Sequence, residues 1–177
     1  MPRIHILGAS GSGTTTLGEA LAKRLGLHHA DTDTFFWVPT EPPYTTRRRP
    51  EDRLALLLRQ LPTTGHWVLS GSALKWATSL EPFYDLIVFL QLDPAVRMER
   101  LRQREFRRYG ARVMLGGDMV AASAEFLAWA AAYDTAGPEQ RSLVAHEAWL
   151  AGQTAAVLRL DSSAPVQDLV AAVLSVL

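Results

Sequence analysis

The sequence predicts an α/β protein of three layers, with a five-stranded parallel sheet that carries helices on both faces. Three observations lead to this fold class. Short apolar runs alternate along the chain with longer segments of helical periodicity. The first apolar run leads directly into a glycine-rich turn and then into a helical pattern. Apolar residues make up 48% of the 177 residues, a proportion that excludes a disordered chain.

Five short runs are expected to be the strands. They cover residues 3–7, 27–30, 67–70, 86–92 and 156–160. The fourth, LIVFLQL, is the clearest, because an unbroken apolar run is typical of a strand covered on both faces. Helical segments separate the runs, so the strands should be parallel. Ligands of such sheets bind beyond the carboxyl ends of the strands.

The helical segments follow the strands in order. Periodicity predicts helices over residues 16–25, 50–61, 94–109, 119–133, 139–151 and 166–177. Pro50 and Pro94 suit the first position of a helix, and Asp93 suits the cap before it. Residues 35–44, FFWVPTEPPY, contain three prolines and are expected to form a loop.

The turn after the first strand reads GASGSGTTT and fits the phosphate-binding pattern G-x-x-x-x-G-K-[ST] at every position but one. Glycines allow tight turns in which successive N–H groups point at phosphate oxygens, and the following helix adds its positive dipole end. A hydroxyl at Thr15 is suited to Mg²⁺. We therefore expect a P-loop NTPase fold that binds ATP and Mg²⁺. The residues expected to hold the nucleotide are Gly8, Ala9, Ser10, Gly11, Ser12, Gly13, Thr14, Thr15 and Thr16.

The one departure from the pattern is Thr14, which stands in the lysine position. Lys23 lies too far along the first helix to replace it, and Lys75 follows the third strand and could reach the pocket. Other interpretations of the loop stay open. A dinucleotide fingerprint would need glycine in place of Thr16, a sulfotransferase loop would need a basic residue in place of Gly11, and a plain turn would bind no ligand.

Arginines cluster twice in the chain. Residues 97–112 hold seven arginines and two glutamates, and five of the arginines share one broad helix face: Arg97, Arg100, Arg104, Arg107 and Arg108. The second cluster is Arg47, Arg48 and Arg49. Guanidinium groups bind phosphate oxygens in bidentate pairs, so we expect one clamp near each substrate. A solvated helix face is the alternative for any single arginine.

Carboxylates follow the second strand at Asp31 and Asp33, on the same side of an extended segment. They are expected to position Mg²⁺, with Asp31 as a ligand beside Thr15, or to orient an acceptor hydroxyl. Helix capping is the competing interpretation. Ser72, after the third strand, is expected at the acceptor as well.

Composition limits the classes of partner. The net charge is +0, which provides no overall attraction to nucleic acid or to anionic membranes. Cysteine is absent, which excludes disulfides and thiolate metal sites. The short apolar run at the N-terminus is interrupted by His5 and fits neither a signal peptide nor a membrane span. A cytoplasmic protein that binds a nucleotide donor and a small-molecule acceptor is expected, with its oligomeric state open.

The chain resembles the nucleoside-monophosphate-kinase-like branch of P-loop proteins, including bacterial proteins labelled adenylate kinase or AAA-type ATPase. The resemblance rests on GASGSGTTTLGEALAKRLG, HADTDTFFW, WVLSGS, RLRQREFRRYGAR and AVLRLDSS. It implies a single P-loop kinase-like domain over residues 1–177, with an acceptor-binding segment near 34–66 and a short lid near 104–118. The GSGTTT form is similar to archaeal cytidylate kinases, and the Asp-x-Asp to shikimate kinase. The adenylate-kinase sequence Asp-Gly-Phe-Pro-Arg after the third strand is replaced by Ser-Gly-Ser.

Three functional hypotheses follow. In the first, the protein is an ATP- and Mg²⁺-dependent phosphotransferase, with Arg104, Arg108 and Arg112 over the transferring phosphoryl group and Asp33 at the acceptor. Residues 47–49, together with Asp31 and Ser72, would bind the acceptor. In the second, the protein binds or senses nucleotides without catalysis. In the third, it is a sulfotransferase.

Overall fold

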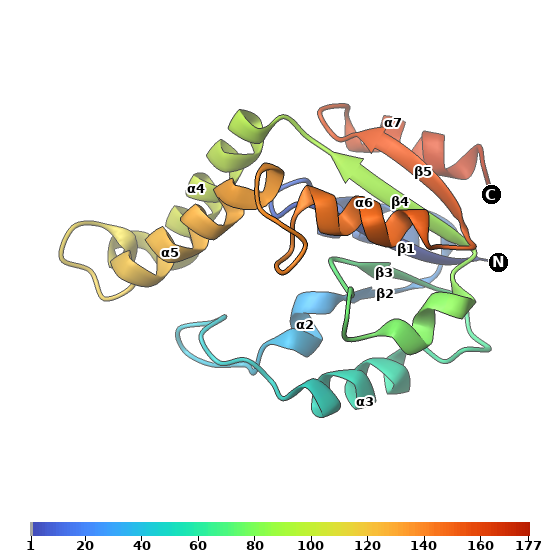
Figure 1. Ribbon diagram of the computed structural model, residues 1–177, viewed down its shortest axis with the longest axis horizontal. Coiled ribbons are helices and arrows are strands. Elements are labelled where there is room, and N and C mark those ends of the chain that lie inside the picture. The colour runs from blue at the N-terminus through green and yellow to red at the C-terminus, as the bar shows by residue number, and fades with distance from the viewer. Residues whose placement is uncertain (1) are drawn as a thin grey trace.

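The protein has a five-stranded sheet in which all neighbouring strands are parallel, as predicted (Figure 1). The computed structural model describes residues 2–177. The strand order is β2-β3-β1-β4-β5. The strands are β1 (Arg3–Gly8), β2 (His28–Asp31), β3 (Trp67–Ser70), β4 (Leu86–Gln91) and β5 (Ala156–Asp161). The first strand is therefore the central strand of the sheet, and its carboxyl end lies at the middle of one edge of the sheet.

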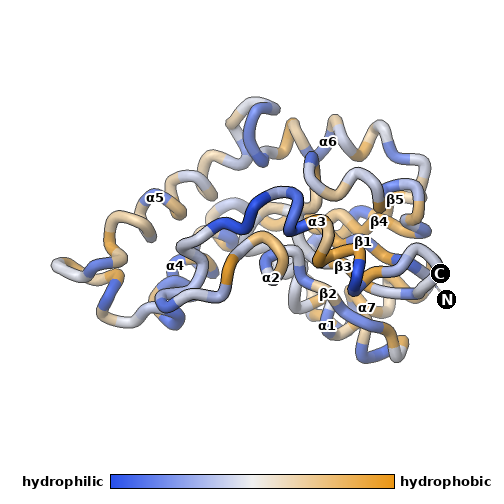
Figure 2. The backbone as a smooth tube through the Cα atoms, turned by 90° about the horizontal axis from the view of Figure 1, so that it is seen from below, coloured by the Kyte–Doolittle hydropathy of each residue, from blue (hydrophilic) through white to orange (hydrophobic). Residues whose placement is uncertain are grey.

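Helices cover both faces of the sheet. Ile4 and Ile6 of β1 belong to a core on one face, with residues of α1 (Thr14–Leu25) and α7 (Val166–Leu174). Leu7 belongs to the core on the other face. That face is covered by α3 (Pro50–Gln60), α6 (Leu143–Ala151) and the short helices α2 (Thr32–Phe36) and η1 (Thr78–Phe83). Figure 2 shows the apolar strands enclosed between helices of mixed hydropathy. The predicted three-layer α/β fold is confirmed.

A pair of helices extends away from the sheet at its carboxyl edge (Figure 1). The pair is α4 (Pro94–Tyr109) and α5 (Val120–Ala131), which packs along α4. The short helix η2 (Gly110–Val113) directly follows α4 in the connection between them. Asp93 caps α4, because its Oδ1 accepts the N–H groups of Ala95 and Val96. Within residues 2–177, no helix combines the length and the apolar character needed to cross a bilayer.

One predicted member of the arginine face is buried. The guanidinium of Arg97 donates to the carbonyl oxygen of Ala130 at 3.0 Å, pairs with Asp134 and lies over the ring of Tyr133. Its side chain is 1% exposed. Arg97 therefore fixes α4 to the end of α5 instead of facing a ligand.

Two element boundaries differ from the prediction because side chains cap the helices. Residues 32–36 form α2, where the sequence predicted a loop from residue 35, because the carboxylate of Asp31 accepts the N–H of Asp33. The sixth helix starts at Leu143 and not at 139, because the hydroxyl of Ser142 accepts the N–H of Ala145. Short polar side chains of this kind commonly set the first residue of a helix.

Two histidines are buried in the core between β1 and α6. His5 stacks on Tyr84, with ring centroids 4.9 Å apart, and its Nδ1 lies 3.3 Å from the carbonyl oxygen of Leu69. His146 has its Nδ1 2.7 Å from the hydroxyl of Tyr133. Burial disfavours the charged imidazolium, which lowers the pKa of His5 to about 4 and the pKa of His146 to about 3.

Acid should therefore destabilise the fold by protonating these histidines. The folded-state pKa of each histidine lies below its unfolded value of about 6.5. The contribution of the neutral histidine to the free energy of unfolding is therefore complete above pH 6.5 and falls as the pH drops toward the folded pKa. For His5, about 2 kcal/mol of unfolding free energy should be lost between pH 8 and pH 5. Urea unfolding of His5→Phe should show a smaller pH-dependent loss by that amount, whereas the exposed-site variant His28→Gln should behave as wild type. Equal losses in all three proteins would contradict this account.

Candidate active site

The turn between β1 and α1 depends on glycine at three positions. A Cβ atom on Gly8 would lie 2.5 Å from Ser12 Oγ and 2.6 Å from the carbonyl oxygen of Leu90, so a side chain is excluded there. Gly11 and Gly13 have φ of +85° and +92°, which favour glycine. No side chain caps α1 at Gly13. The first N–H groups of α1, which have no partner within the helix, are thus available for a ligand.

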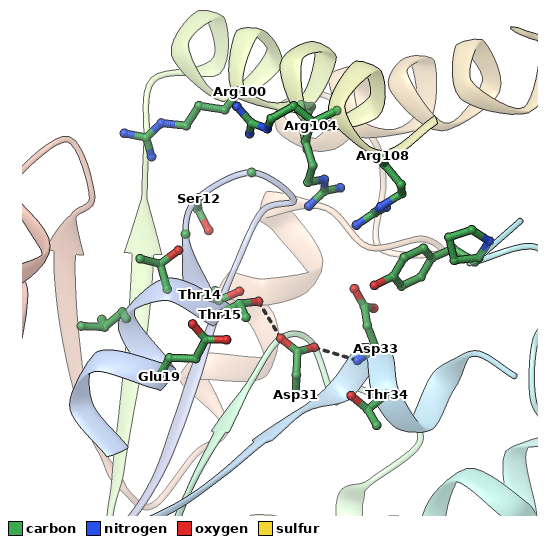
Figure 3. A pocket seen from close by; sticks show the side chains of 18 of the residues that line it. Ser12, Thr14, Thr15, Glu19, Asp31, Asp33, Thr34, Arg100, Arg104 and Arg108 are labelled. Carbon is green, nitrogen blue, oxygen red and sulfur yellow. Dashed lines mark hydrogen bonds between the residues drawn. The ribbon is translucent and has the colours of Figure 1, made fainter. Parts of the chain in front are cut away.

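Ser12 supports the interpretation of this turn as an anion site. Its side chain is buried, at 1% exposure, and its Oγ has no hydrogen-bond partner within the described residues 2–177. A buried hydroxyl without a partner costs free energy that a bound oxygen atom would recover. Ser12 also lines the main cavity, where Figure 3 draws it beside Thr14.

A cavity of about 980 Å³ runs along the carboxyl edge of the sheet. One end is lined by the loop after β5 and the start of α7, from Ser162 to Leu169. The middle is lined by residues 11–17, and the other end by residues 37–44. Four arginines of α4 form its upper wall: Arg100, Arg104, Arg107 and Arg108. Figure 3 shows Arg104 and Arg108 pointing toward the P-loop and Asp33, whereas Arg100 extends sideways.

The hydroxyl of Thr15 and the carboxylate of Asp31, the two residues predicted as metal ligands, lie within hydrogen-bonding distance of each other. Thr15 donates to Asp31 Oδ2 at 2.6 Å, and Ser70 donates to the same oxygen at 3.1 Å. His29 extends the chain of contacts, since its Nε2 lies 2.9 Å from Ser70 Oγ. Sequence reasoning assigned no ligand role to His29, which is two residues from Asp31 on β2 and therefore points to the same side.

These oxygens fit Mg²⁺, which prefers hard ligands and usually takes only one or two from the protein. In the described part of the chain there is no group of three or more His, Asp or Glu side chains arranged to hold a metal ion. A cation at Thr15 and Asp31 would therefore complete its coordination with phosphate oxygens and water.

Asp33 lies in the cavity opposite the arginines (Figure 3). Desolvation by the surrounding walls raises the pKa of Asp33, and the neighbouring charge of Asp31 raises it further. Arg141, Arg104 and Arg108 oppose this rise in its pKa. A carboxylate with a raised pKa, close to cations, is suited to accept a proton.

Arg104 and Arg108, two of the three arginines expected over the transferring phosphoryl group, line the cavity. The Nε of Arg104 is buried and has no hydrogen-bond partner among residues 2–177, and burial followed by the charge of Arg108 lowers the pKa of Arg104. Arg108 lies over the ring of Tyr44, with its guanidinium carbon 4.0 Å from the centroid. Two guanidinium groups held this close repel each other, and a bound anion would relieve the repulsion.

Arg112, the third predicted clamp residue, is not among the residues that line this cavity. Its guanidinium forms a bidentate pair with Asp118, at 2.9 and 2.7 Å, and also contacts Glu41 at 3.1 Å. Nearby, the hydroxyl of Tyr109 donates to the carbonyl oxygen of Pro43. These contacts join the loop after α4 to the loop that carries Tyr44.

The predicted acceptor cluster Arg47, Arg48 and Arg49 is likewise not brought to the cavity. Arg48 donates to the carbonyl oxygens of Phe35 and Trp37, and Arg49 pairs with acidic residues at the start of α3. The guanidinium carbon of Arg47 lies 6.0 Å from the ring centroid of Trp37, on an exposed segment. The arginines engage local partners because backbone carbonyls and carboxylates lie within their reach.

Ser72 also lies apart from the cavity lining. Its Oγ is 3.4 Å from Nε2 of the buried His146, in the core behind β3. The structure thus brings together the P-loop, Asp31, Asp33, Arg104 and Arg108, and separates Ser72, Arg112 and residues 47–49 from them.

Several residues near the P-loop have no individual signal in the sequence. Trp37 and Tyr44 line the end of the cavity formed by residues 37–44; the prolines near them indicated a loop, and the family resemblance indicated only a segment, residues 34–66, without naming these side chains. Arg141, from the segment before α6, donates to Ser10 Oγ at 2.6 Å. An isolated arginine 131 positions from Ser10 in the sequence gives no local signal, so only the tertiary structure reveals it.

Comparison with known proteins agrees with this geometry. Residues 4–114 match a family described as AAA domain. A curated relative, the uncharacterized protein YqaC of Bacillus subtilis (strain 168), is 44% identical over 174 residues, covering 98% of this chain and 96% of the relative.

Solved structures with a similar fold are less than 20% identical in sequence. A gluconokinase from Sinorhizobium meliloti 1021 matches with a TM-score of 0.55 and 19% identity over 98% of this chain and 90% of its own. A sugar kinase from Janibacter sp. HTCC2649 matches with a TM-score of 0.53 and 18% sequence identity, covering 99% of this chain and 93% of its own. A shikimate kinase from Bacteroides thetaiotaomicron matches with a TM-score of 0.50 and 16% sequence identity, covering 99% of this chain and 97% of its own. The chain thus belongs to the AAA domain family of P-loop proteins and has the fold of P-loop kinases.

Proposed function

We propose that the protein transfers the terminal phosphoryl group of ATP, with Mg²⁺, to a small-molecule acceptor. One observation carries the proposal: a single cavity joins the P-loop, four arginines of α4 and the carboxylates of Asp31 and Asp33. The likeness to the gluconokinase, sugar kinase and shikimate kinase structures, as their names describe them, supports the same class of reaction. Phosphoryl transfer needs mainly positioning and neutralised charge, which are what these residues offer.

The donor would occupy the middle of the cavity and its end near α7. The backbone N–H groups of residues 8–16 and the hydroxyl of Ser12 would bind the phosphates, and the partly apolar wall from Ser162 to Leu169 would face the base. Thr15 and Asp31 would hold Mg²⁺. The cation, when bound, neutralises charge on the phosphate oxygens.

The acceptor would occupy the end lined by Asp33, Trp37 and Tyr44. Asp33 would take the proton of an acceptor hydroxyl while that oxygen bonds to the terminal phosphorus. The bond from this phosphorus to the bridging oxygen breaks, and ADP leaves. A phosphate acceptor would need no proton transfer. The aromatic and proline side chains of residues 37–44 favour an acceptor with a flat or apolar portion.

The segment of residues 104–118 would act as a lid over the transferring phosphoryl group. Arg104 and Arg108 would contact its oxygens, and Arg112 would hold the lid against the acceptor segment through Glu41. Arg48 would position the same acceptor segment through the carbonyls of Phe35 and Trp37. Residues 34–66 would thus shape the acceptor end even though Arg47, Arg48 and Arg49 do not line it.

The proposal is tested first by calorimetry of the purified protein with Mg²⁺-ATP, then by a coupled assay of ADP release across acceptors. Stability should rise by about 2.7 kcal/mol at an ATP concentration of about 100 times its dissociation constant. Acceptor-dependent turnover supports the kinase. ATP binding without turnover on nucleotides, sugars or shikimate-like acceptors supports the sensing alternative. Preference for adenosine 3′,5′-bisphosphate over ATP supports a sulfotransferase.

Removing the carboxylate of Asp33 tests the acceptor end. Asp33→Asn should lower turnover by about 10²- to 10⁴-fold, the usual contribution of a positioned base, while ATP binding is retained. The exposed-site variant Asp52→Asn should keep wild-type rates. Because the pKa of Asp33 is raised and its ionised form accepts the proton, the wild-type rate should fall as the pH drops through that raised pKa. Unchanged turnover in Asp33→Asn would refute its role.

Removing the hydroxyl of Thr15 tests the metal site. Thr15→Val loses one oxygen ligand, so the Mg²⁺ concentration that gives half-maximal turnover should rise about tenfold. The distant variant Thr135→Val is the control and should keep the wild-type requirement. A normal Mg²⁺ dependence in Thr15→Val would show that the cation binds elsewhere.

A further inference from the structure

The P-loop lacks the ammonium group that normally reaches the terminal phosphates, and neither lysine of the chain replaces it. Lys23 lies in the last turn of α1, at the far end from the P-loop. Lys75 Nζ donates to the carbonyl oxygens of Pro138 and Glu139, at 3.0 and 3.4 Å, so its ammonium group is engaged by the backbone of the segment before α6. The positive charge must come from another side chain if the site is to balance a triphosphate.

Arg141 brings a guanidinium to the top of the P-loop. Its Nη2 donates to the hydroxyl of Ser10 at 2.6 Å. Ser10 is the third residue of the turn, between β1 and the glycines Gly11 and Gly13. An arginine side chain has five N–H donors, and this bond to a neutral hydroxyl uses one of them.

The segment that carries Arg141 is fixed in place from several sides. Lys75 holds its start through the carbonyls of Pro138 and Glu139. Ser142, which is fully buried, donates to the carbonyl oxygen of Gly137 and caps α6. The ring of Trp129 lies under the guanidinium of Arg141, with its centroid 4.7 Å away. A guanidinium that is held in this way loses little conformational freedom when it binds a ligand.

Charged side chains that line the cavity act electrostatically on Arg141, whose position is fixed by its bond to Ser10. Burial lowers the pKa of Arg141, whereas the carboxylate of Asp33 raises it and the cation of Arg104 lowers it. Asp33 and Arg104 both line the cavity beyond the P-loop, away from the wall formed by residues 162–169. A triphosphate whose base lies against that wall would have its terminal phosphate near these groups.

We propose that Arg141 binds the terminal phosphate of the nucleoside triphosphate and supplies the charge that lysine supplies in other P-loops. The inference rests on the proposed function. In the free protein, the guanidinium is bonded to Ser10; with the triphosphate bound, it donates to phosphate oxygens, which accept two parallel N–H groups of arginine. Lys75 then acts as a positioning residue, because it anchors the segment that carries Arg141.

Calorimetry with Mg²⁺-ATP and Mg²⁺-ADP tests the inference. Arg141→Met should lower the affinity for ATP by about 10- to 100-fold, the usual effect of losing a charged hydrogen bond, and should affect ADP much less, since ADP lacks the terminal phosphate. Arg159→Met, which removes an arginine that pairs with Glu147 at the sheet edge, is the control for loss of one positive charge and should bind both nucleotides normally.

Restoring the missing lysine provides the second arm. Thr14→Lys in the Arg141→Met background should recover most of the lost ATP affinity, because an ammonium then occupies the usual position. An equal loss for ATP and ADP in Arg141→Met, with no recovery on adding lysine, would overturn the inference. If Arg141→Met fails to fold, Arg141→Lys keeps a cation at this position. It should bind ATP more weakly than wild type but still bind ATP more tightly than ADP. Equal affinity of Arg141→Lys for the two nucleotides would overturn the inference.

Different results would overturn the proposed phosphotransferase function and the proposed role of Arg141. Wild-type protein that binds neither ATP nor another nucleoside triphosphate would overturn the proposed function. Wild-type protein that binds ATP, together with an Arg141→Met variant of unchanged affinity, would overturn the role of Arg141 alone.

Discussion

The close packing of β1 against β4 at Gly8 is the constraint from which the rest of the site follows. The absence of a side chain at Gly8 lets the turn pass beside the carbonyl oxygen of Leu90 and lets Ser12 fold beneath it. That path directs the amides at the start of α1 toward the cavity. The carboxylates of Asp31 and Asp33 then lie nearby because β2 is separated from β1 by β3 alone. Sheet order and one glycine together bring the P-loop and these carboxylates to one cavity.

Positive charge reaches this centre from outside the sheet. The P-loop itself contributes only neutral amides and hydroxyls, whereas guanidinium groups approach from α4 and from the segment before α6. Arg97 anchors α4 to α5 by burying its own charge against Asp134. The glycine turn thus provides the shape of the site, as in other P-loops, while the positive side chains nearby come from α4 and from the segment before α6 instead of from a lysine of the turn.

Much of the fold and part of the site could be predicted from local sequence signals. Apolar runs located all five strands, and the glycine spacing located the P-loop, because both patterns reflect backbone requirements that act over a few residues. The arginines at 47–49 illustrate the limit. Their clustering indicated a phosphate site, yet Arg48 instead donates to two carbonyls of the chain segment that it follows. Arg141 is the opposite case: the sequence around it contains no motif, yet long-range packing brings its guanidinium to Ser10.

The ion pairs of Arg112 have a consequence for the two loops that they connect. The guanidinium contacts Asp118 on its own loop and Glu41 on the opposite one, while Tyr109 donates to Pro43 beside it. These contacts join the loop after α4 to residues 41–43, beside the end of the cavity lined by Tyr44. A displacement of either loop away from the other would break both the Arg112–Glu41 ion pair and the Tyr109–Pro43 hydrogen bond, so the two loops resist separation as one unit.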